Sequence, residues 1–540
     1  MAPSAKHDDN EPLLASNSQH VADASIGAAE SDEETLVHAE QMSLGRLALV
    51  IGIAYIGVLL GAIDQTIVAT LSGPIASEFS SLSLLSYLVT AYLIASAACQ
   101  PVSGRLTDIF GRGPSLALCN LLFALGNLIC AMSHSEAAMI GGRVVAGLGG
   151  GGLMSISSFV ASDLVPLRAR GITQGACNLC WAAGGMLGGL FGGLFNDHSR
   201  WGWRLAFLIQ VPFSLVSALL VALMVRVPPK MSNKSYLARI DFAGVFLSTA
   251  FLVLLLLGLS SGGNLVPWLH PLPLTAIPLS LVIFAAFIWT EYRASLPIIP
   301  IRLCLQRTIF ASCMCNFFAV AAVTGALFHV PLFLQVMGDS ATGAGLKIAS
   351  SPVGVFVGSL TVGYIIKRTG RYVKLAIVSV AILALGIGIL SFQGIGRPLW
   401  LSSVAFFVMG VGYGAMLTIT LLACLASVSQ SQQAVITSAT YMARCLGATV
   451  GITIGSAVYQ NILKARLWHR FAHYPNAADE VQRIRDDLSE LKHLPDGWYP
   501  GVIASFMEAF EGLWLTLLAM SILSFVCVCA IRQHELRSTI

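Results

Sequence analysis

Charged residues are scarce in this chain: Asp, Glu, Lys and Arg make up 11% of its 540 residues, whereas apolar residues make up 56%. Soluble domains carry about 25% charged residues, so this composition leaves no room for a solvated globular domain of any size. The sequence also has no Walker loop, no zinc-ligand cluster and no catalytic triad. These absences argue against an enzyme, a metalloprotein, an ATP-driven pump and a nucleic-acid-binding protein.

The first 43 residues lack the apolar segment of a cleavable signal peptide and carry an acidic cluster at Glu30 and Asp32–Glu34 instead. We expect a disordered cytosolic tail over residues 1–43. The twelve cysteines lie in or beside apolar runs, and none lies in the long polar segment 463–511. A disulfide framework is therefore not expected.

Long apolar runs are what the sequence has in abundance. A helix needs about 20 apolar residues to cross a bilayer. Fourteen segments meet this need, so we predict an all-α membrane protein with 14 transmembrane helices, at 46–72, 84–104, 114–133, 137–160, 171–195, 204–226, 240–260, 272–291, 309–336, 344–366, 374–394, 400–425, 434–462 and 512–531.

Basic residues are distributed unevenly between the predicted loops. The loops on the side of the N-terminal tail hold most of them, such as Arg112, Arg168 and Lys230, whereas the short loops on the other side hold few. Because cytosolic loops carry the excess of Lys and Arg, we expect both termini in the cytosol.

The two parts of the chain resemble each other. Segments 104–112 and 363–371 share the spacing of two glycines followed by an arginine, and 150–154 repeats in 412–416. Two six-helix halves around a site at the membrane midplane are the architecture of alternating-access carriers. We therefore divide the chain into the tail 1–43, a six-helix bundle 44–230, an inserted helix pair with linkers 231–307, and a second six-helix bundle 308–540 with a non-cytosolic loop 463–511.

A short cytosolic turn between the second and third predicted helices concentrates charge and glycine. Charge so close to the membrane is costly and indicates a function, here a gate. The gating residues that we expect are Gly104, Arg105, Asp108, Gly111 and Arg112.

Asp64 lies inside the first apolar run, where an ionised carboxylate costs about 2.5–3.5 kcal/mol. It can bind and release a proton as its surroundings open and close, or it can hold the charge of a cationic substrate. Its neighbour Gln65 is a candidate for the cavity wall. Arg143, in the fourth predicted helix, needs a carboxylate or several carbonyls as partners. Either Asp64 and Arg143 form a pair that protonation breaks, or Asp64 makes a structural hydrogen bond and Arg143 binds helix-end carbonyls.

The fifth predicted helix carries a ridge of glycines that includes Gly184, Gly188 and Gly192. Such small-residue ridges allow very close helix packing, and we expect this one to meet the other half and close a gate. Gln174 and Asn178, one turn apart, are further cavity candidates. Arg444, in the thirteenth predicted helix, is another intramembrane cation that needs an acceptor.

The tail contains an acid four residues before a pair of leucines: Asp9 precedes Leu13 and Leu14. This pattern is typical of an acidic dileucine sorting signal that binds an adaptor. It predicts delivery to an internal membrane.

The segment 104–112 resembles the cytosolic signature of the major facilitator superfamily, although Gly113 stands where a basic residue usually ends that signature. The segment 62–70 resembles the first helix of the fourteen-spanner drug:proton antiporters. Within that family, segments 149–154, 161–168 and 203–212 are most similar to fungal vacuolar basic amino acid permeases. The resemblance implies proton antiport of lysine, arginine or histidine into the vacuole, driven by the proton gradient without a bound cofactor.

We therefore expect a proton-coupled antiporter of basic amino acids in the vacuole membrane. A plasma-membrane exporter of drugs or toxins is an alternative in the same superfamily, and a nutrient sensor built on a carrier scaffold is a second. The expected partners are a small-molecule substrate, the lipid bilayer and a sorting adaptor.

Overall fold

The computed structural model describes residues 43–536 except for gaps at 72–74, 76–77, 80–82, 167–168, 199–200, 226–241, 263–265, 295–300, 340–342, 344–346, 394–397, 399, 430–431, 475–476 and 487–496. The predicted sorting signal at Asp9, Leu13 and Leu14 lies outside the described residues.

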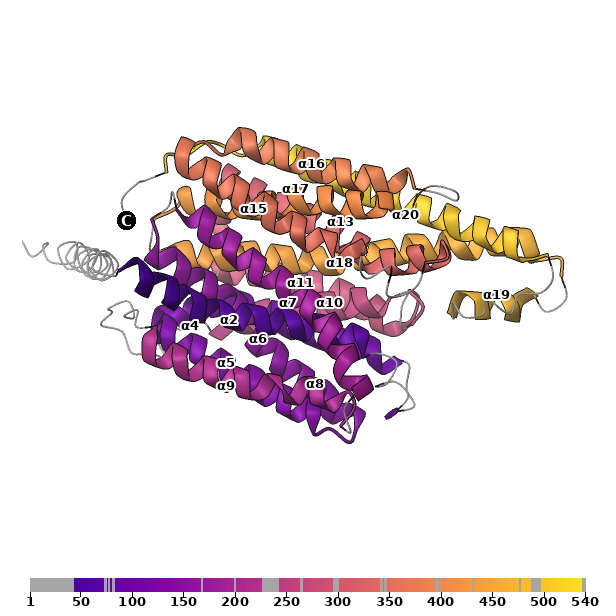
Figure 1. Ribbon diagram of the computed structural model, residues 1–540, viewed down its shortest axis with the longest axis horizontal. Coiled ribbons are helices and arrows are strands. Elements are labelled where there is room, and N and C mark those ends of the chain that lie inside the picture. The colour runs from indigo at the N-terminus through magenta and orange to yellow at the C-terminus, as the bar shows by residue number, and fades with distance from the viewer. Residues whose placement is uncertain are drawn as a thin grey trace, which may run out of the picture.

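Helices make up both halves of the molecule (Figure 1). The first half contains α2 (Leu44–Thr70), α4 (Ser83–Phe110), α5 (Arg112–Ala131), α6 (Glu136–Leu164), α7 (Arg170–His198), α8 (Arg204–Leu208) and α9 (Gln210–Met224). A middle segment follows with α10 (Phe242–Ser261), α11 (Pro271–Arg293) and α12 (Ile301–Cys304). The second half contains α13 (Arg307–Val336), α15 (Ser350–Thr369), α16 (Val373–Ser391), α17 (Trp400–Ala426), α18 (Gln433–Phe471), α19 (Ala477–Asp486) and α20 (Tyr499–Cys529).

The prediction of an all-α membrane protein is confirmed. Each predicted segment overlaps a helix, and the sixth is divided into α8 and α9 on either side of Ile209. The last two bounds were wrong, because α18 continues to Phe471 and α20 begins at Tyr499, so both helices extend into the predicted loop 463–511. Among the described residues, 10 helices are long and apolar enough to cross a membrane. The count of fourteen spans stays a prediction.

Both ends of the helical bundle lie on the same face. Figure 1 shows the start of α2 and the end of α20 at the left; we call this the tail face and its opposite the far face. Helix α18 has 39 residues and is about 58 Å long, well beyond the hydrocarbon thickness of about 30 Å. The far ends of α18 and α20, with α19 beside them, therefore extend past the membrane, and the segment 463–511 is helical over much of its length.

Glycines allow the fourth helix of each half to pack between the second and the third. A Cβ atom on Gly151 of α6 would lie 2.3 Å from the carbonyl oxygen of Ser96 on α4, and one on Gly149 would lie 2.5 Å from the backbone nitrogen of Phe123 on α5. In the second half, Gly414 and Gly412 of α17 make the same approaches to α15 and α16. The contacts therefore match Gly151 with Gly414 and Gly149 with Gly412. The sequence repeat, which aligned 150–154 with 412–416, matched each residue of α6 with the residue of α17 one position earlier.

The fifth helix of each half packs in an equivalent way against the first. A Cβ on Gly184 of α7 would meet the carbonyl of Leu59 at 2.5 Å, and a Cβ on Gly447 of α18 would meet the carbonyl of Phe317 at 2.2 Å. Gly188 approaches Ile63, and Gly451 approaches Ala321, at the next turn. The halves therefore repeat the same packing, which fixes the positions that correspond between them.

The halves meet along a seam. Helix α7 packs against α15 and α17 across it, and α18 packs against α4 and α6. The inserted helix α10 touches both α4 and α18, so the middle segment lies against one side of this seam. Each half has its own hydrophobic core, and polar side chains of the two halves contact each other at the seam.

Candidate functional site: a buried ion pair beside the seam

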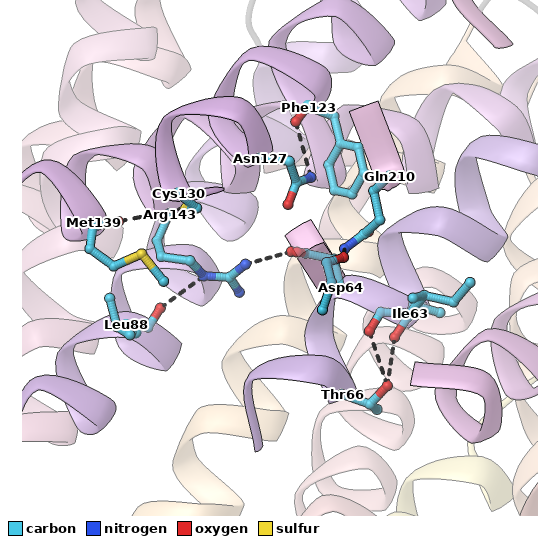
Figure 2. A network of polar contacts seen from close by, with 12 residues as sticks. Ile63, Asp64, Thr66, Leu88, Phe123, Asn127, Cys130, Met139, Arg143 and Gln210 are labelled. Atoms are coloured by element: carbon cyan, nitrogen blue, oxygen red, sulfur yellow. Dashed lines mark hydrogen bonds and ion pairs between the residues drawn. The ribbon is translucent and has the colours of Figure 1, made fainter. Parts of the chain in front are cut away.

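Asp64 and Arg143 form an ion pair inside the first half. Arg143 Nη1 donates to Asp64 Oδ2 at 2.6 Å, and both side chains are almost completely buried (Figure 2). The guanidinium also lies over the ring of Tyr92, 4.3 Å from its centroid, and its Nε donates to the carbonyl of Leu88. The structure thus brings together the two residues that the sequence offered as a charge pair. Since desolvation makes such a pair costly, removing one charge would leave the other buried without compensation.

The second carboxylate oxygen of Asp64, Oδ1, has different neighbours from Oδ2. Arg143 donates to Oδ2 only, and the buried Oδ1 has the side-chain amide of Gln210 as its polar neighbour. The side chain of Gln210 lies beside the carboxylate (Figure 2) and donates through Nε2 to the carbonyl of Ala206, which leaves its own Oε1 without a described donor. Asn127, drawn in the same region, has the same arrangement, with its Oδ1 without a described donor. Buried acceptors usually have partners, so this region can accept a proton or a ligand with N–H groups.

Gln210 and Asn127 were not predicted as site residues. A signal was present, since each is an uncharged amide side chain within an apolar helix. What could not be read from the sequence is that α5 and α9 place them near α2.

The corresponding positions of the second half carry no charge. Because Ile63 and Ala321 are equivalent, the next residues, Asp64 and Ala322, are equivalent too. Ala146 and Met409 make the same contact with the third helix of their halves, which makes Arg143 and Phe406 correspond. Ala322 and Phe406 are buried apolar residues. The ion pair is thus a device of the first half alone.

The predicted gate forms a polar cluster at the tail face. Arg112 Nε donates to Asp163 Oδ2 at 2.8 Å, and Arg112 also donates to Thr107. Gly111 has φ 88°, a left-handed conformation that favours glycine and ends α4 directly before α5. Gly104 lies buried on α4; Arg105 and Asp108 also lie on α4, but their side chains are outside the described part.

The structure explains why a basic residue is missing after Arg112. A Cβ on Gly113 would lie 2.1 Å from the carbonyl oxygen of Val225, which follows α9. The close approach of these two segments leaves no space for a side chain at this position.

The halves contact each other near the tail face. Arg170 Nη1 donates to Gln433 Oε1 at 2.7 Å, from one half to the other. Asn178 of α7 donates to Ser359 of α15 at 3.0 Å and accepts from Gln174 at 3.1 Å, so these two cavity candidates do lie at the seam. Gly171 and Gly363 bring the backbones of α7 and α15 so close that a Cβ on Gly363 would lie 2.7 Å from Gly171.

A small cavity lies beside these contacts, between α6, α7 and α17. Its lining includes Ser158, Gln174 and Thr418. Tyr441 of α18 reaches across the seam to Ser158, with 2.6 Å between the hydroxyl oxygens. Polar side chains of both halves therefore surround the same space.

The glycine ridge of α7 does not meet the other half as expected. Gly184 and Gly188 pack against Leu59, Ile63 and Thr66 of α2, within the same half. Gly192 lies on α7, but its surroundings are outside the described part. The ridge therefore fixes how α7 lies on the helix that carries Asp64.

Gln65 and Arg444 are the remaining candidates for the cavity wall. Gln65 lies next to Tyr92, the residue that stacks on Arg143. Arg444 is 9% exposed and donates to Asn316 Oδ1 at 2.8 Å and to the carbonyl of Leu417 at 3.0 Å.

A second polar cluster at the far face was not expected from the sequence. Arg204 Nη1 lies 2.6 Å from Glu78 Oε1, and Trp203 Nε1 donates to the same carboxylate at 2.6 Å. Arg204 Nη2 donates to the carbonyl of Ser133. Partial burial alone would raise the pKa of Glu78, but the hydrogen bonds from Arg204 and Trp203 outweigh it and lower the pKa.

Two six-helix halves with repeated packing, a polar seam and a buried ion pair define a membrane transporter. The chain belongs to the major facilitator superfamily, because the sequence model of that family matches residues 54–452. Members of this family are transporters and not enzymes.

Similar proteins include fungal transporters. The multidrug resistance protein fnx1 of Schizosaccharomyces pombe is 36% identical over 93% of this chain and 95% of its own length. The vacuolar membrane amino acid uptake transporter fnx2 of the same organism is 30% identical over 89% of this chain and 83% of its own length. The efflux pump dotC of Dothistroma septosporum is 28% identical over 95% of this chain and 87% of its own length.

Solved structures share the fold. A bacterial homologue of the human lysosomal transporter Spinster, in an inward-facing unoccupied conformation, matches with a TM-score of 0.57 at 16% identity, over 92% of this chain and all of that one. The human organic anion transporter MFSD10 matches with a TM-score of 0.55 at 15% identity, over 89% of this chain and all of that one.

Proposed function

We propose that this protein is a proton-coupled antiporter that moves lysine, arginine and histidine from the cytosol into the vacuole. The observation that carries the proposal is the buried Asp64–Arg143 pair, in which Arg143 binds only one of the two carboxylate oxygens of Asp64. The similarity to fnx2, whose name describes vacuolar amino acid uptake, supports the choice of substrate and membrane.

The proposed coupling uses one carboxylate for two ligands. A proton on Asp64 Oδ1 removes the negative charge that Arg143 pairs with at Oδ2, which weakens the pair. A cationic substrate needs the same carboxylate in its ionised form. Since Asp64 satisfies either the proton or the substrate cation, binding of one releases the other, which is the requirement for antiport.

The energy source of the proposed cycle is the pH difference across the membrane. Each unit of pH difference supplies about 1.4 kcal/mol per proton, which gives roughly tenfold accumulation for an electroneutral exchange. No bound cofactor takes part in this scheme.

The tail face would lie in the cytosol, following the basic residues in its loops. The acidic dileucine at Asp9, Leu13 and Leu14 would then be available to an adaptor that directs the protein to the vacuole. The vacuolar location therefore depends on the sorting signal and on the similarity to fnx2.

A second candidate is a plasma-membrane exporter of drugs or toxins. The similarity to fnx1, named for multidrug resistance, and to the efflux pump dotC favours it. The third possibility, a nutrient sensor on a carrier scaffold, would use the same ion pair without net transport.

The experiment is uptake of labelled arginine into acidified vesicles that contain the protein. We expect uptake that a protonophore abolishes and that leucine does not reduce. Uptake that survives the protonophore excludes proton antiport, and drug extrusion without uptake of any basic amino acid favours the exporter. Binding without uptake favours the sensor.

A further inference from the structure

We propose that Arg444 binds the carboxylate of the substrate; this inference rests on the proposed function and makes it more specific. Arg444 lies on α18 in the second half, whereas Asp64, the proposed site for the substrate cation, lies on α2 in the first. A basic amino acid would then be held at both ends, with its carboxylate in the second half and its cationic side chain at Asp64.

The argument begins with the unmatched charge of Arg444. Its two acceptors, Asn316 Oδ1 and the carbonyl of Leu417, are both neutral, and its guanidinium lies over the ring of Tyr441 at 4.8 Å. Among the described residues, no acidic group forms an ion pair with it. In contrast, the membrane-embedded Arg143 has a carboxylate partner. Arg444 is only 9% exposed, and buried charges in proteins are normally paired with an opposite charge.

The guanidinium of Arg444 also has donors to spare. A guanidinium has five N–H groups, and the described hydrogen bonds use Nε and one N–H of Nη2. The two N–H groups of Nη1 have no acceptor in the described part of the chain. A carboxylate matches the planar arrangement of such donors better than any other small anionic group of an amino acid.

Arg444 lies where a transported molecule would pass. Tyr441, on which it stacks, reaches Ser158 of the first half, and Ser158 lines the cavity at the seam. Cys177 of α7 and Tyr413 of α17 are close enough to interact with its charge. Residues of both halves therefore surround Arg444.

Tyr92 is close to residues of both charged centres. It stacks on Arg143, and its hydroxyl is near enough to interact electrostatically with Asp64 and with Cys445. Cys445 is the neighbour of Arg444 in the sequence. The carboxylate site and the cation site are therefore adjacent parts of one region.

The comparison of the halves agrees with a specialised role. Gly184 and Gly447 are equivalent glycines, and Arg444 lies three residues before Gly447. The corresponding residue of the first half is Trp181, so that half has no counterpart of this arginine. Likewise, the second half has apolar residues in place of Asp64 and Arg143. One half therefore carries the titratable pair and the other the unpaired cation, an arrangement that can bind a ligand with both signs of charge.

The test compares arginine with agmatine, which keeps the guanidinium but has no carboxylate. Binding to the purified, detergent-solubilised protein is measured with both compounds. We expect arginine to bind at least about tenfold more tightly than agmatine, because a hydrogen-bonded charge pair contributes about that much to affinity. Arg444→Gln should weaken arginine to the level of agmatine and leave agmatine unchanged.

Asn316→Asp is a second variant, for the case that Arg444→Gln does not fold. It places a carboxylate where Asn316 Oδ1 now accepts from Arg444, so a competing anion is built into the site without removing the cation. Arginine should lose its advantage over agmatine in this variant as well. Lys374→Gln, at an exposed position of α16, is the control for removing a positive charge and should keep the wild-type ratio.

The outcomes separate this inference from the function on which it rests. If wild-type protein binds arginine and agmatine equally, or if Arg444→Gln and Asn316→Asp keep the preference for arginine, the role of Arg444 is wrong while a cationic substrate remains supported. If neither compound binds, the proposed function is wrong and this inference is overturned with it.

Discussion

Arg170 and Gln433 occupy equivalent positions in α7 and α18 and are hydrogen-bonded to each other across the seam at 2.7 Å. Their equivalence follows from the glycine contacts, since each lies fourteen residues before one of the matched pair Gly184 and Gly447. The contact therefore lies near the axis that relates the halves, at the tail face. Alternating access requires this face to open, which would break the Arg170–Gln433 bond.

The first prediction concerns this closure. Gly363→Val places a branched side chain where α15 now touches Gly171 of α7, with a Cβ 2.7 Å from its backbone. We expect the tail face to remain open and transport to fall at least tenfold, an effect of about 1.4 kcal/mol or more. Labelling of a cysteine introduced at the seam should increase.

Gly388→Val on α16 is the matched control, because a Cβ on Gly388 has no atom within 4 Å. It should leave transport and labelling unchanged. Full transport by Gly363→Val would mean that the close approach of α7 and α15 is not part of the cycle.

The second prediction uses two glycines of the α7 ridge. A Cβ on Gly188 would lie 2.4 Å from the carbonyl of Ile63, whereas one on Gly185 would lie 3.8 Å from Thr66. We expect Gly188→Ala to displace α7 from α2 at a cost of about 1–3 kcal/mol and to reduce transport. Gly185→Ala should be tolerated. The measurement is thermal unfolding together with arginine uptake, and equal behaviour of the two variants would contradict the packing described here.

The third prediction concerns pH and the far face. Hydrogen bonds lower the pKa of Glu78 from its ordinary value of 4.5. At a pH between the lowered pKa and 4.5, the folded protein therefore keeps this carboxylate ionised, whereas the unfolded chain binds a proton there. Its contribution to stability is therefore present above pH 4.5 and decreases as the pH falls through the lower, folded pKa. Glu78→Gln should unfold at a lower temperature than wild type at pH 7.

The difference should shrink as the pH is lowered below 4.5. Glu511→Gln, which changes an exposed acid of α20, serves as the control and should show no such trend. If the difference between Glu78→Gln and wild type grew toward acid pH, the sign of the interaction would be the opposite of the one described.

The fourth prediction concerns sorting. Replacement of Leu13 and Leu14 by Ala removes the apolar pair that an adaptor would bind and leaves the membrane domain untouched. We expect a fluorescently tagged protein to move from the vacuole rim to the cell surface. A double mutant that still marks the vacuole rim as wild type does would exclude the dileucine as the signal.

Much of the fold could be predicted from the sequence, because runs of apolar residues long enough to cross a membrane have few other solutions. The repeated glycine spacing at 104–112 and 363–371 also identified the two halves. Which residue of α6 corresponds to which residue of α17 could not be predicted in this way. The four consecutive glycines Gly149–Gly152 allow several alignments with α17, and only their contacts with Ser96 and Phe123 select one of them.

The site was predictable in its charged residues but not in its surroundings. Asp64 and Arg143 are conspicuous because charge inside an apolar helix is costly. Gln210 and Asn127 are less conspicuous, since amides are cheaper to bury, and the asymmetry with Ala322 and Phe406 requires the packing of both halves. The ridge at Gly184 and Gly188 illustrates the same limit, because its spacing indicates close packing but not which helix it meets.

The central claim is that Asp64 exchanges a proton for a cationic substrate. It is tested most directly by adding arginine to purified protein in weakly buffered solution at the pH where uptake is half-maximal, with a pH-sensitive dye. We predict that wild-type protein releases protons on binding arginine and that Asp64→Asn, which keeps the size of the side chain but cannot titrate, releases none. Proton release by Asp64→Asn equal to that of wild type would contradict the account.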